Sequence, residues 1–176
     1  RVMAEDAVNE AINHLRKIVP DSVTETLAIV GAEGYSVLMN QIPRLASQYS
    51  LSEETIEHLL NRYGSLLDEV LEPIVKNSTL SERLIENLPY LKAEILYAVT
   101  HEGARSVDDV LSRRTRIAFE ASDQGLSALE DVATLIASPL GWNAADKKSS
   151  IKEYRELVER QNEMLNIAKK TKTKVS

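Results

Sequence analysis

The sequence contains no cysteine and few aromatic residues, which make up 5% of its 176 residues. The absence of cysteine excludes a thiol nucleophile, a disulfide framework, an iron–sulfur cluster and a cysteine zinc site. No long stretch alternates apolar and polar residues, so the sequence predicts no strand with any strength. The longest uncharged run, residues 132–145, contains Pro139 and Gly141, and it is shorter than the roughly 18 to 20 apolar residues of a membrane helix.

Positive charge is also in short supply. The 21 basic residues stand against 27 acidic ones, which gives a net charge of −6. This balance argues against an electrostatic grip on nucleic acid. The chain opens at Arg1 without the basic and apolar segment of a secretory signal, and we interpret it as a piece of a longer protein.

Apolar residues recur at spacings of three and four along most of the chain, which is typical of amphipathic helices. We therefore predict an all-α fold, an irregular bundle of about six to seven helices. Helices are expected to begin with serine caps at Ser52, Ser65 and Ser106. Prolines are expected to end the first helix, over residues 2–19, at Pro20 and a later one at Pro73.

The region between Pro20 and Gly34 is the one candidate domain boundary. Within it, the apolar run of residues 27–30 is expected to be a buried extended segment. A long polar helix from about Asn143 is expected to close the chain and to lead into a lysine-rich tail.

Motifs for catalysis and cofactor binding are absent. The sequence has no G-x-G-x-x-G turn, no Walker phosphate loop and no G-x-S-x-G elbow. His101 and Glu102 begin the zinc motif H-E-x-x-H, but Arg105 stands where the second histidine should be. The three histidines form no ligand cluster and are expected at helix surfaces or caps. We predict no catalytic, cofactor-binding or metal-ligating residue in this chain.

Three arginines, Arg113, Arg114 and Arg116, form the most notable charged cluster. They could grip phosphate, or form part of a helix-turn-helix element. Arg114, however, shares a helical stripe with apolar residues, and Glu94 and Glu102 share the apolar face of the preceding helix. We therefore expect a buried ion pair between Arg114 and one of these two carboxylates, with Arg113 and Arg116 on its flanks.

The segment from Tyr90 to Arg116, YLKAEILYAVTHEGARSVDDVLSRRTR, resembles the signature of the C-terminal helical domain of FAD-dependent glycerol-3-phosphate dehydrogenases. Three shorter segments also resemble this family, at residues 3–8, 61–65 and 140–142. Leucine at position 96 and glycine at position 103 depart from many members and suggest an actinobacterial-type branch. The residues to which we assign a structural or interdomain role are Arg62, Tyr63, Glu94, Glu102, Arg105, Arg113, Arg114 and Arg116.

The resemblance implies a domain organisation. Residues 1–20 would be the last helix of a flavin domain, residues 21–34 a connection, residues 35–168 the C-terminal helical domain, and residues 169–176 a basic, disordered tail. The full-length enzyme would oxidise glycerol 3-phosphate to dihydroxyacetone phosphate and pass electrons through FAD to quinone, or to oxygen in the related oxidases. This piece would hold no FAD, lack the catalytic residues and pack on its own N-terminal flavin domain.

The resemblance also implies a cytoplasmic protein, and leaves open a homo-oligomer and a peripheral contact with the inner face of the cell membrane. Two other functions stay open at this point. One is a freestanding helical adaptor or regulatory domain whose apolar stripes serve a partner. The other is a nucleic-acid module that uses residues 113–116 and the lysine tail, which the net charge disfavours.

Overall fold

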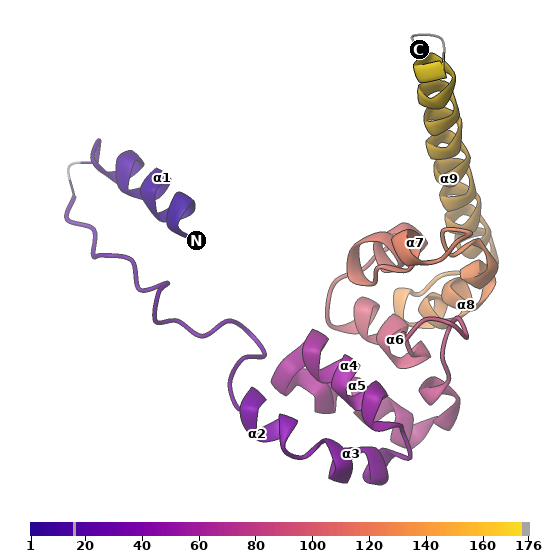
Figure 1. Cartoon of the computed structure of the whole chain (residues 1–176), viewed down its shortest axis with the longest axis horizontal. Coiled ribbons are helices and arrows are strands. Elements are labelled where there is room, and N and C mark those ends of the chain that lie inside the picture. Colours follow the sequence, from indigo (N-terminus) through magenta and orange to yellow (C-terminus); the bar gives the residue numbers. More distant parts are fainter. Residues whose placement is uncertain (16, 174–176) are drawn as a thin grey trace.

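The computed structural model describes residues 1–15 and 17–173, with side chains up to residue 165 (Figure 1). Within these ranges the chain is all-α, as predicted, and holds no strand. Its α-helices are α1 (Val2–Ile12), α2 (Tyr35–Met39), α3 (Ile42–Tyr49), α4 (Glu53–Tyr63), α5 (Leu67–Lys76), α6 (Lys92–Thr100), α7 (Ile117–Glu120), α8 (Leu129–Leu140) and α9 (Ala144–Thr173).

The described residues form nine α-helices, more than the six to seven expected, and two stretches expected as single helices are divided. Pro43 lies at the start of α3 and separates it from α2, since a proline in a first helical turn costs no backbone hydrogen bond. The stretch after Ser106 divides into a π-helix, Asp109–Arg114, and the short α7.

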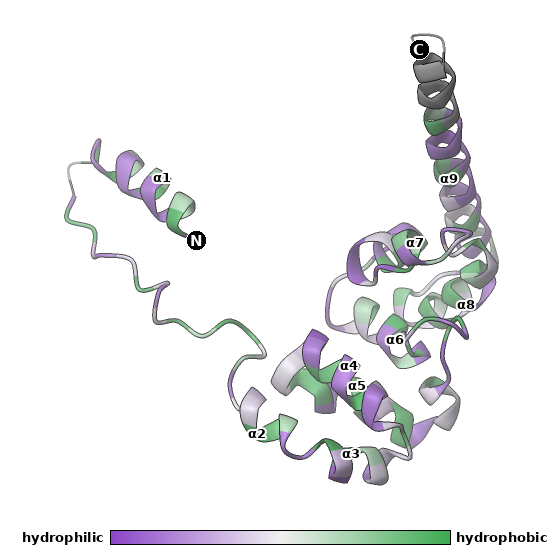
Figure 2. Ribbon diagram, viewed as in Figure 1, coloured by the Kyte–Doolittle hydropathy of each residue, from purple (hydrophilic) through white to green (hydrophobic). Residues whose placement is uncertain are grey.

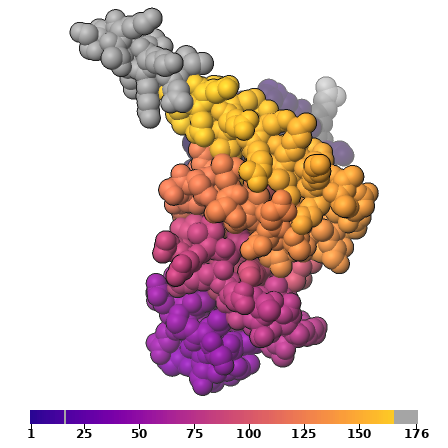
Figure 3. Space-filling model, turned by 90° about the vertical axis from the view of Figure 1, so that its right-hand side faces the viewer, coloured from indigo at the N-terminus to yellow at the C-terminus, as the bar shows by residue number. Residues whose placement is uncertain are grey.

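Two hydrophobic clusters form the core, and α6 belongs to both. The first gathers side chains of α3, α4 and α5, and α6 contributes Tyr97 to it. The second gathers side chains of the π-helix, α7, α8 and α9, and α6 contributes Ile95 to it. The space-filling view shows the two halves stacked along the chain order, with α9 at the opposite end from α3 and α4 (Figure 3). A helix with apolar residues around most of its circumference is expected to lie inside a fold, and α6 does.

The N-terminal segment lies apart from this core. Helix α1 buries none of its residues, and an extended connection leads from it to α2 (Figure 1). The helix predicted over residues 2–19 ends at Ile12, because no packing stabilises further turns of a short helix in water. The run of residues 27–30, predicted to be buried, is exposed. Both corrections have the same cause, which is that this segment contacts the rest of the domain only at its C-terminal end.

Of the predicted serine caps, the one at Ser52 forms and the one at Ser65 does not. Ser52 begins α4 as predicted, and its hydroxyl accepts a hydrogen bond from the Thr55 amide at 3.1 Å. Ser65 caps nothing, because residues 64–66 form a 3₁₀ turn and α5 begins at Leu67 without a side-chain cap. Pro73 does not end α5, which continues to Lys76. The buried side chains of α5 hold the helix together across the missing backbone hydrogen bond.

The two serines provide a matched test of capping. Replacing Ser52 by alanine is expected to lower the free energy of unfolding by about 1 kcal/mol, because the Thr55 amide loses its acceptor. Replacing Ser65 by alanine is expected to change it little, since Ser65 is exposed and its hydroxyl caps no helix. Urea unfolding of the two variants measures the difference. A loss at Ser65 as large as that at Ser52 would contradict this assignment.

Helix α9 closes the chain, as predicted from about Asn143 onward. It packs on the core through Ile151, Tyr154 and Val158, and its residues 161–165 are exposed. The helix continues through Thr173, five residues into the segment predicted as a disordered tail, and residues 174–176 lie outside the described part. Among the described helices, including this long one, none is apolar enough over a sufficient length to cross a membrane.

Candidate functional site

Glu94 is the centre of a buried polar network between the two hydrophobic clusters. It lies in the first turn of α6 and is completely buried. Its Oε2 accepts a hydrogen bond from the Leu91 amide at 2.7 Å, so the carboxylate caps the helix on which it lies. A negative charge in a first turn also interacts favourably with the helix dipole.

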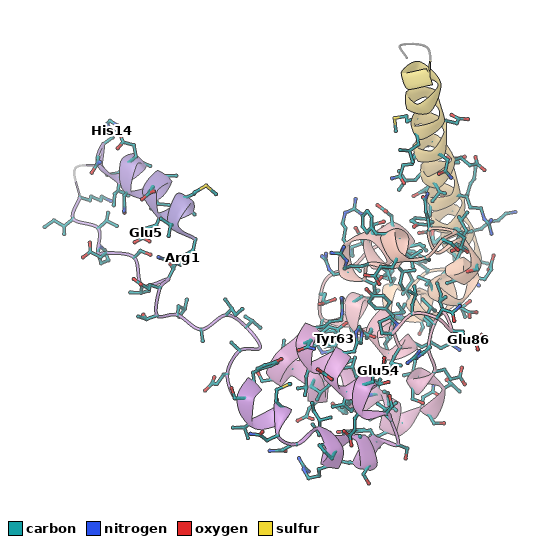
Figure 4. The ribbon with its side chains drawn as sticks, in the orientation of Figure 1. Arg1, Glu5, His14, Glu54, Tyr63 and Glu86 are labelled. Atoms are coloured by element: carbon teal, nitrogen blue, oxygen red, sulfur yellow. The ribbon has the colours of Figure 1, made fainter. Side chains whose placement is uncertain are left out.

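Helix α4 supplies the remaining partners of this carboxylate. The Tyr63 hydroxyl donates to Glu94 Oε1 at 3.0 Å, and His58 Nε2 lies 3.2 Å from the same oxygen. Arg62 Nε lies 3.3 Å from it and forms an ion pair. Burial, and then the charge of Glu94, raise the pKa of the Tyr63 phenol, so that Tyr63 stays a hydrogen-bond donor at every ordinary pH. Figure 4 labels Tyr63 at the end of α4, where it faces α6.

Arg62 connects this network to the second half of the domain. Its Nη2 donates to the backbone carbonyl of Arg114 at 2.5 Å, and its guanidinium carbon lies 5.2 Å from the centre of the Tyr90 ring. The Tyr90 hydroxyl in turn donates to Glu120 at 3.0 Å and accepts from the Arg116 amide at 3.3 Å. One arginine thus contacts both α6 and the last residue of the π-helix.

The predicted ion pair of Arg114 with Glu94 or Glu102 is not formed. Arg114 is half-buried, and its Nε donates to the backbone carbonyl of Glu102 at 2.8 Å. The prediction assumed α-helical spacing, whereas residues 109–114 form a π-helix with more residues per turn. Thr115 therefore takes the buried position, 2% exposed, and its hydroxyl donates to the Val110 carbonyl at 2.8 Å.

The other arginines of the signature lie at the surface. Arg113 pairs with Asp108 and with Asp109, the latter at 3.1 Å, and Arg116 pairs with Glu120 at 3.2 Å. The side chain of Arg105 is exposed, and its backbone amide donates to Asp109 at 3.0 Å. Each of these pairs lies within its own segment, and together they take up much of the positive charge that a phosphate would need.

Glu102, at the C-terminal side of α6, is half-buried, and its Oε2 has no hydrogen-bond partner among the described residues. Burial is the main cause that raises the pKa of this carboxyl, while the charges of Arg62 and Arg114 oppose the rise. A carboxyl whose pKa is higher in the folded state binds protons more tightly there. Its ionisation therefore costs stability as the pH rises above the ordinary carboxyl range.

Replacing Glu102 by glutamine tests this cost. At pH 4 the glutamate of the parent is largely neutral in both the folded and the unfolded chain, as the glutamine of the variant always is. The unfolding free energies of parent and variant are therefore expected to differ least at this pH. At pH 7.5 glutamine avoids the desolvation of a charge, so the variant is expected to gain stability relative to the parent between pH 4 and pH 7.5. Urea titrations at the two pH values measure this shift. No shift, or one toward glutamate, would show that the two arginines outweigh burial.

The geometry supports a structural role for the network. Glu94 is sealed from solvent, and both of its oxygens are engaged, so it is not available as a general base. No group of three or more metal-ligating side chains occurs in the described part of the chain. Sequence reasoning missed His58 and Tyr90 as members. The signal for His58 was its spacing of four from Arg62 on one helix, which places both on the same face.

The comparisons with known proteins agree with the family resemblance of residues 90–116. Residues 22–147 match the family described as the C-terminal domain of alpha-glycerophosphate oxidase. The chain is 38% identical over 159 residues to glycerol-3-phosphate dehydrogenase 2 of Mycobacterium bovis. This match covers 90% of this chain and 27% of that protein. The chain is 32% identical to the mitochondrial glycerol-3-phosphate dehydrogenase of Arabidopsis thaliana, again over 90% of this chain and 27% of the relative.

A glycerol-3-phosphate dehydrogenase of Synechocystis is 30% identical over 90% of this chain and 29% of the relative. This chain therefore spans little more than a quarter of the length of these curated relatives. No solved structure shows a significant match. The predicted resemblance is confirmed, and the segment that carried it, residues 90–116, contains both Glu94 and the π-helix. The chain belongs to the family of the C-terminal domain of alpha-glycerophosphate oxidase.

Proposed function

We propose that this chain is the C-terminal helical domain of a flavin-dependent glycerol-3-phosphate dehydrogenase. The full-length enzyme oxidises glycerol 3-phosphate to dihydroxyacetone phosphate and transfers the electrons through FAD to quinone. The observation that carries the proposal is the Glu94 network, because the segment that resembles the family forms the buried joint between the two halves of the domain. The role of this domain is to pack on the flavin domain, and it contributes no catalytic residue.

The described residues do not fit FAD. A dinucleotide needs a glycine turn between a strand and a helix for its pyrophosphate, and the described chain has no strand. A Cβ atom added to Gly31 would lie 2.7 Å from the Tyr63 carbonyl oxygen. The glycine there makes room for protein backbone and not for a phosphate. FAD belongs to the flavin domain in this proposal.

Helix α1 and the connection after it support a partner domain. They carry most of the exposed large apolar side chains of the described chain. Between α1 and residues 19–24 lies an apolar hollow of about 520 Å³, lined by Val8, Ile12, Val19 and Val23 among others. Figure 4 shows Arg1 and Glu5 of α1 far from Tyr63 in the body. In the proposed organisation, residues 1–20 complete the flavin domain, residues 21–34 connect it to this domain, and residues 35–168 form this domain.

The two other functions receive less support. A nucleic-acid module would need free arginines, whereas Arg113 and Arg116 pair with carboxylates of their own segment. A freestanding adaptor would share the exposed apolar surface, but it would not explain why the relatives continue well beyond the matched region.

The test compares the full-length enzyme with the 176-residue chain. We expect the full-length protein to purify with flavin absorbance and to reduce a dye when glycerol 3-phosphate is added. The isolated chain is expected to be folded, helical and colourless, and inactive in the same assay. Flavin bound to the isolated chain, or a full-length protein inactive with glycerol 3-phosphate, would contradict the proposal.

The lysine-rich C-terminus is the proposed membrane contact of a cytoplasmic enzyme. Residues 169–174 contain four lysines and no acidic residue, and each contributes about 1 kcal/mol near an anionic lipid surface. Truncating the full-length enzyme after Ala168 is expected to reduce its co-sedimentation with vesicles rich in phosphatidylserine and to leave the weak binding to neutral vesicles unchanged. Equal binding before and after truncation would eliminate the tail as an anchor.

A further inference from the structure

We propose that the exposed segment Leu27–Val30, whose last residue lies in a turn in the isolated chain, adds as a β-strand to an exposed sheet edge of the flavin domain. This inference rests on the proposed function, because it takes that domain as the partner. It identifies the part of the connection that makes the contact and the kind of surface that receives it.

The side chains of this segment face water although they are apolar. Leu27 is 66% exposed, Ile29 80% and Val30 86%, and Figure 2 shows hydrophobic residues along the connection between α1 and α2. Ile29 and Val30 are β-branched, which favours extended backbone. Residues 26–32 contain neither a charged residue nor a proline, so the segment lacks the features that normally keep an edge strand from pairing.

Most of the backbone of the segment is unpaired as well; the exceptions are the Leu27 amide, which donates to the Val23 carbonyl at 3.1 Å, and the Ile29 carbonyl. Among the described residues, the amides of Ala28, Ile29 and Val30 donate no hydrogen bond, and the carbonyls of Leu27, Ala28 and Val30 accept none. A run of free donors and acceptors beside exposed apolar side chains is what strand addition to a sheet uses. The backbone supplies the hydrogen bonds, and alternate side chains supply the contacts.

The C-terminal end of the segment is clamped to the body. The Gly31 carbonyl accepts from the Ser65 amide at 2.9 Å, which ties the chain to the 3₁₀ turn after α4. The Ala32 amide closes a local turn on the Ile29 carbonyl at 3.0 Å. Just beyond it, the Tyr35 hydroxyl donates to Asn61 Oδ1 at 2.6 Å. A segment that is fixed at one end loses less conformational entropy when it binds.

The flavin domain fits as the partner for two reasons. This chain spans only 27% of the length of its mycobacterial relative, so most of such an enzyme lies outside it. A domain that binds FAD through a strand, a glycine turn and a helix contains a sheet, and an open sheet has edge strands. In this arrangement α1 covers one part of the flavin domain, and Leu27–Val30 extends its sheet.

Hydrogen exchange with single-residue resolution, on the full-length enzyme and on the 176-residue chain, tests the proposal. Strand pairing along one edge engages every second residue. We therefore expect alternate amides within residues 28–30 to exchange at least about tenfold more slowly in the full-length enzyme, and all three of them to exchange rapidly in the isolated chain. Of the variants Ala28→Pro and Ile29→Pro, only the one at a protected amide should abolish protection of the segment.

Three results would overturn the proposal. Equal rates in both proteins would show that no strand forms, and uniform slowing of the amides of residues 28–30 would indicate an apolar contact without strand pairing. Protection in the isolated chain that rises with protein concentration would assign the segment to a second copy instead. Dye reduction with glycerol 3-phosphate, measured on the same sample, separates these results from a failure of the proposed function.

Discussion

Replacing Glu94 by alanine is expected to lower the free energy of unfolding by about 3–5 kcal/mol, because removing one member of a buried ion pair leaves the other without compensation. Arg62 would lose its anionic partner, while the Tyr63 hydroxyl and the Leu91 amide would lose their acceptor. A folded domain has only about 5–15 kcal/mol of stability, so this change would consume a large part of it. Urea unfolding followed by circular dichroism measures the loss.

Two further variants make this expectation specific. Glutamine at position 94 keeps the shape and an acceptor for the Leu91 amide, so Glu94→Gln is expected to lose less than Glu94→Ala. Arg113→Ala removes an exposed ion pair of the same signature and is expected to change stability little, because surface pairs contribute little. If Glu94→Ala were no more harmful than Arg113→Ala, the network would not hold the two halves together.

Replacing Gly64 by alanine is expected to have the second large effect. Gly64 lies at the end of α4 with φ 56° and ψ −129°, a conformation that costs other residues about 1–3 kcal/mol. A Cβ atom there would also lie 1.9 Å from the Gly31 carbonyl oxygen. The two backbones would have to separate, and the hydrogen bond from the Ser65 amide to Gly31 would break.

Gly34 provides the matched control. It also has a positive φ, 73°, but a Cβ atom added to it meets nothing within 4 Å. Gly34→Ala is therefore expected to cost only the backbone term, about 1–2 kcal/mol. We expect a lower urea midpoint for Gly64→Ala, together with faster proteolytic cleavage of the connection before α2. Equal midpoints and equal cleavage rates for the two variants would show that the close approach of Gly31 and Gly64 does not matter.

Much of the local structure follows from sequence because it depends on neighbouring residues. The serine at 52 starts α4 since its hydroxyl reaches an amide three residues away. Pro43 lies at the start of α3 because a proline in a first turn costs no backbone hydrogen bond. The long final helix and the all-α class likewise follow from apolar spacing along single segments.

The burial of Glu94 could also be predicted from the sequence, since its apolar neighbours on α6 indicate it. The partners of Glu94 could not be predicted. Glu94 pairs with α4, whose Tyr63 is 31 positions away, and no spacing rule indicates which of several arginines will approach a carboxylate across two packed helices.

Tertiary structure also decided the π-helix and the exposed connection. Just after the π-helix, Thr115 takes the interior position in place of Arg114, and both its amide and its hydroxyl donate to the Val110 carbonyl. In the connection, Leu27–Val30 has the composition of a buried strand, yet nothing in the described chain covers it. Sequence alone determined the all-α class, the start of α4 at Ser52 and the apolar stripe of most helices. Which residues meet was decided by packing, because contacts between distant segments depend on the positions of whole helices and on the presence of a partner surface.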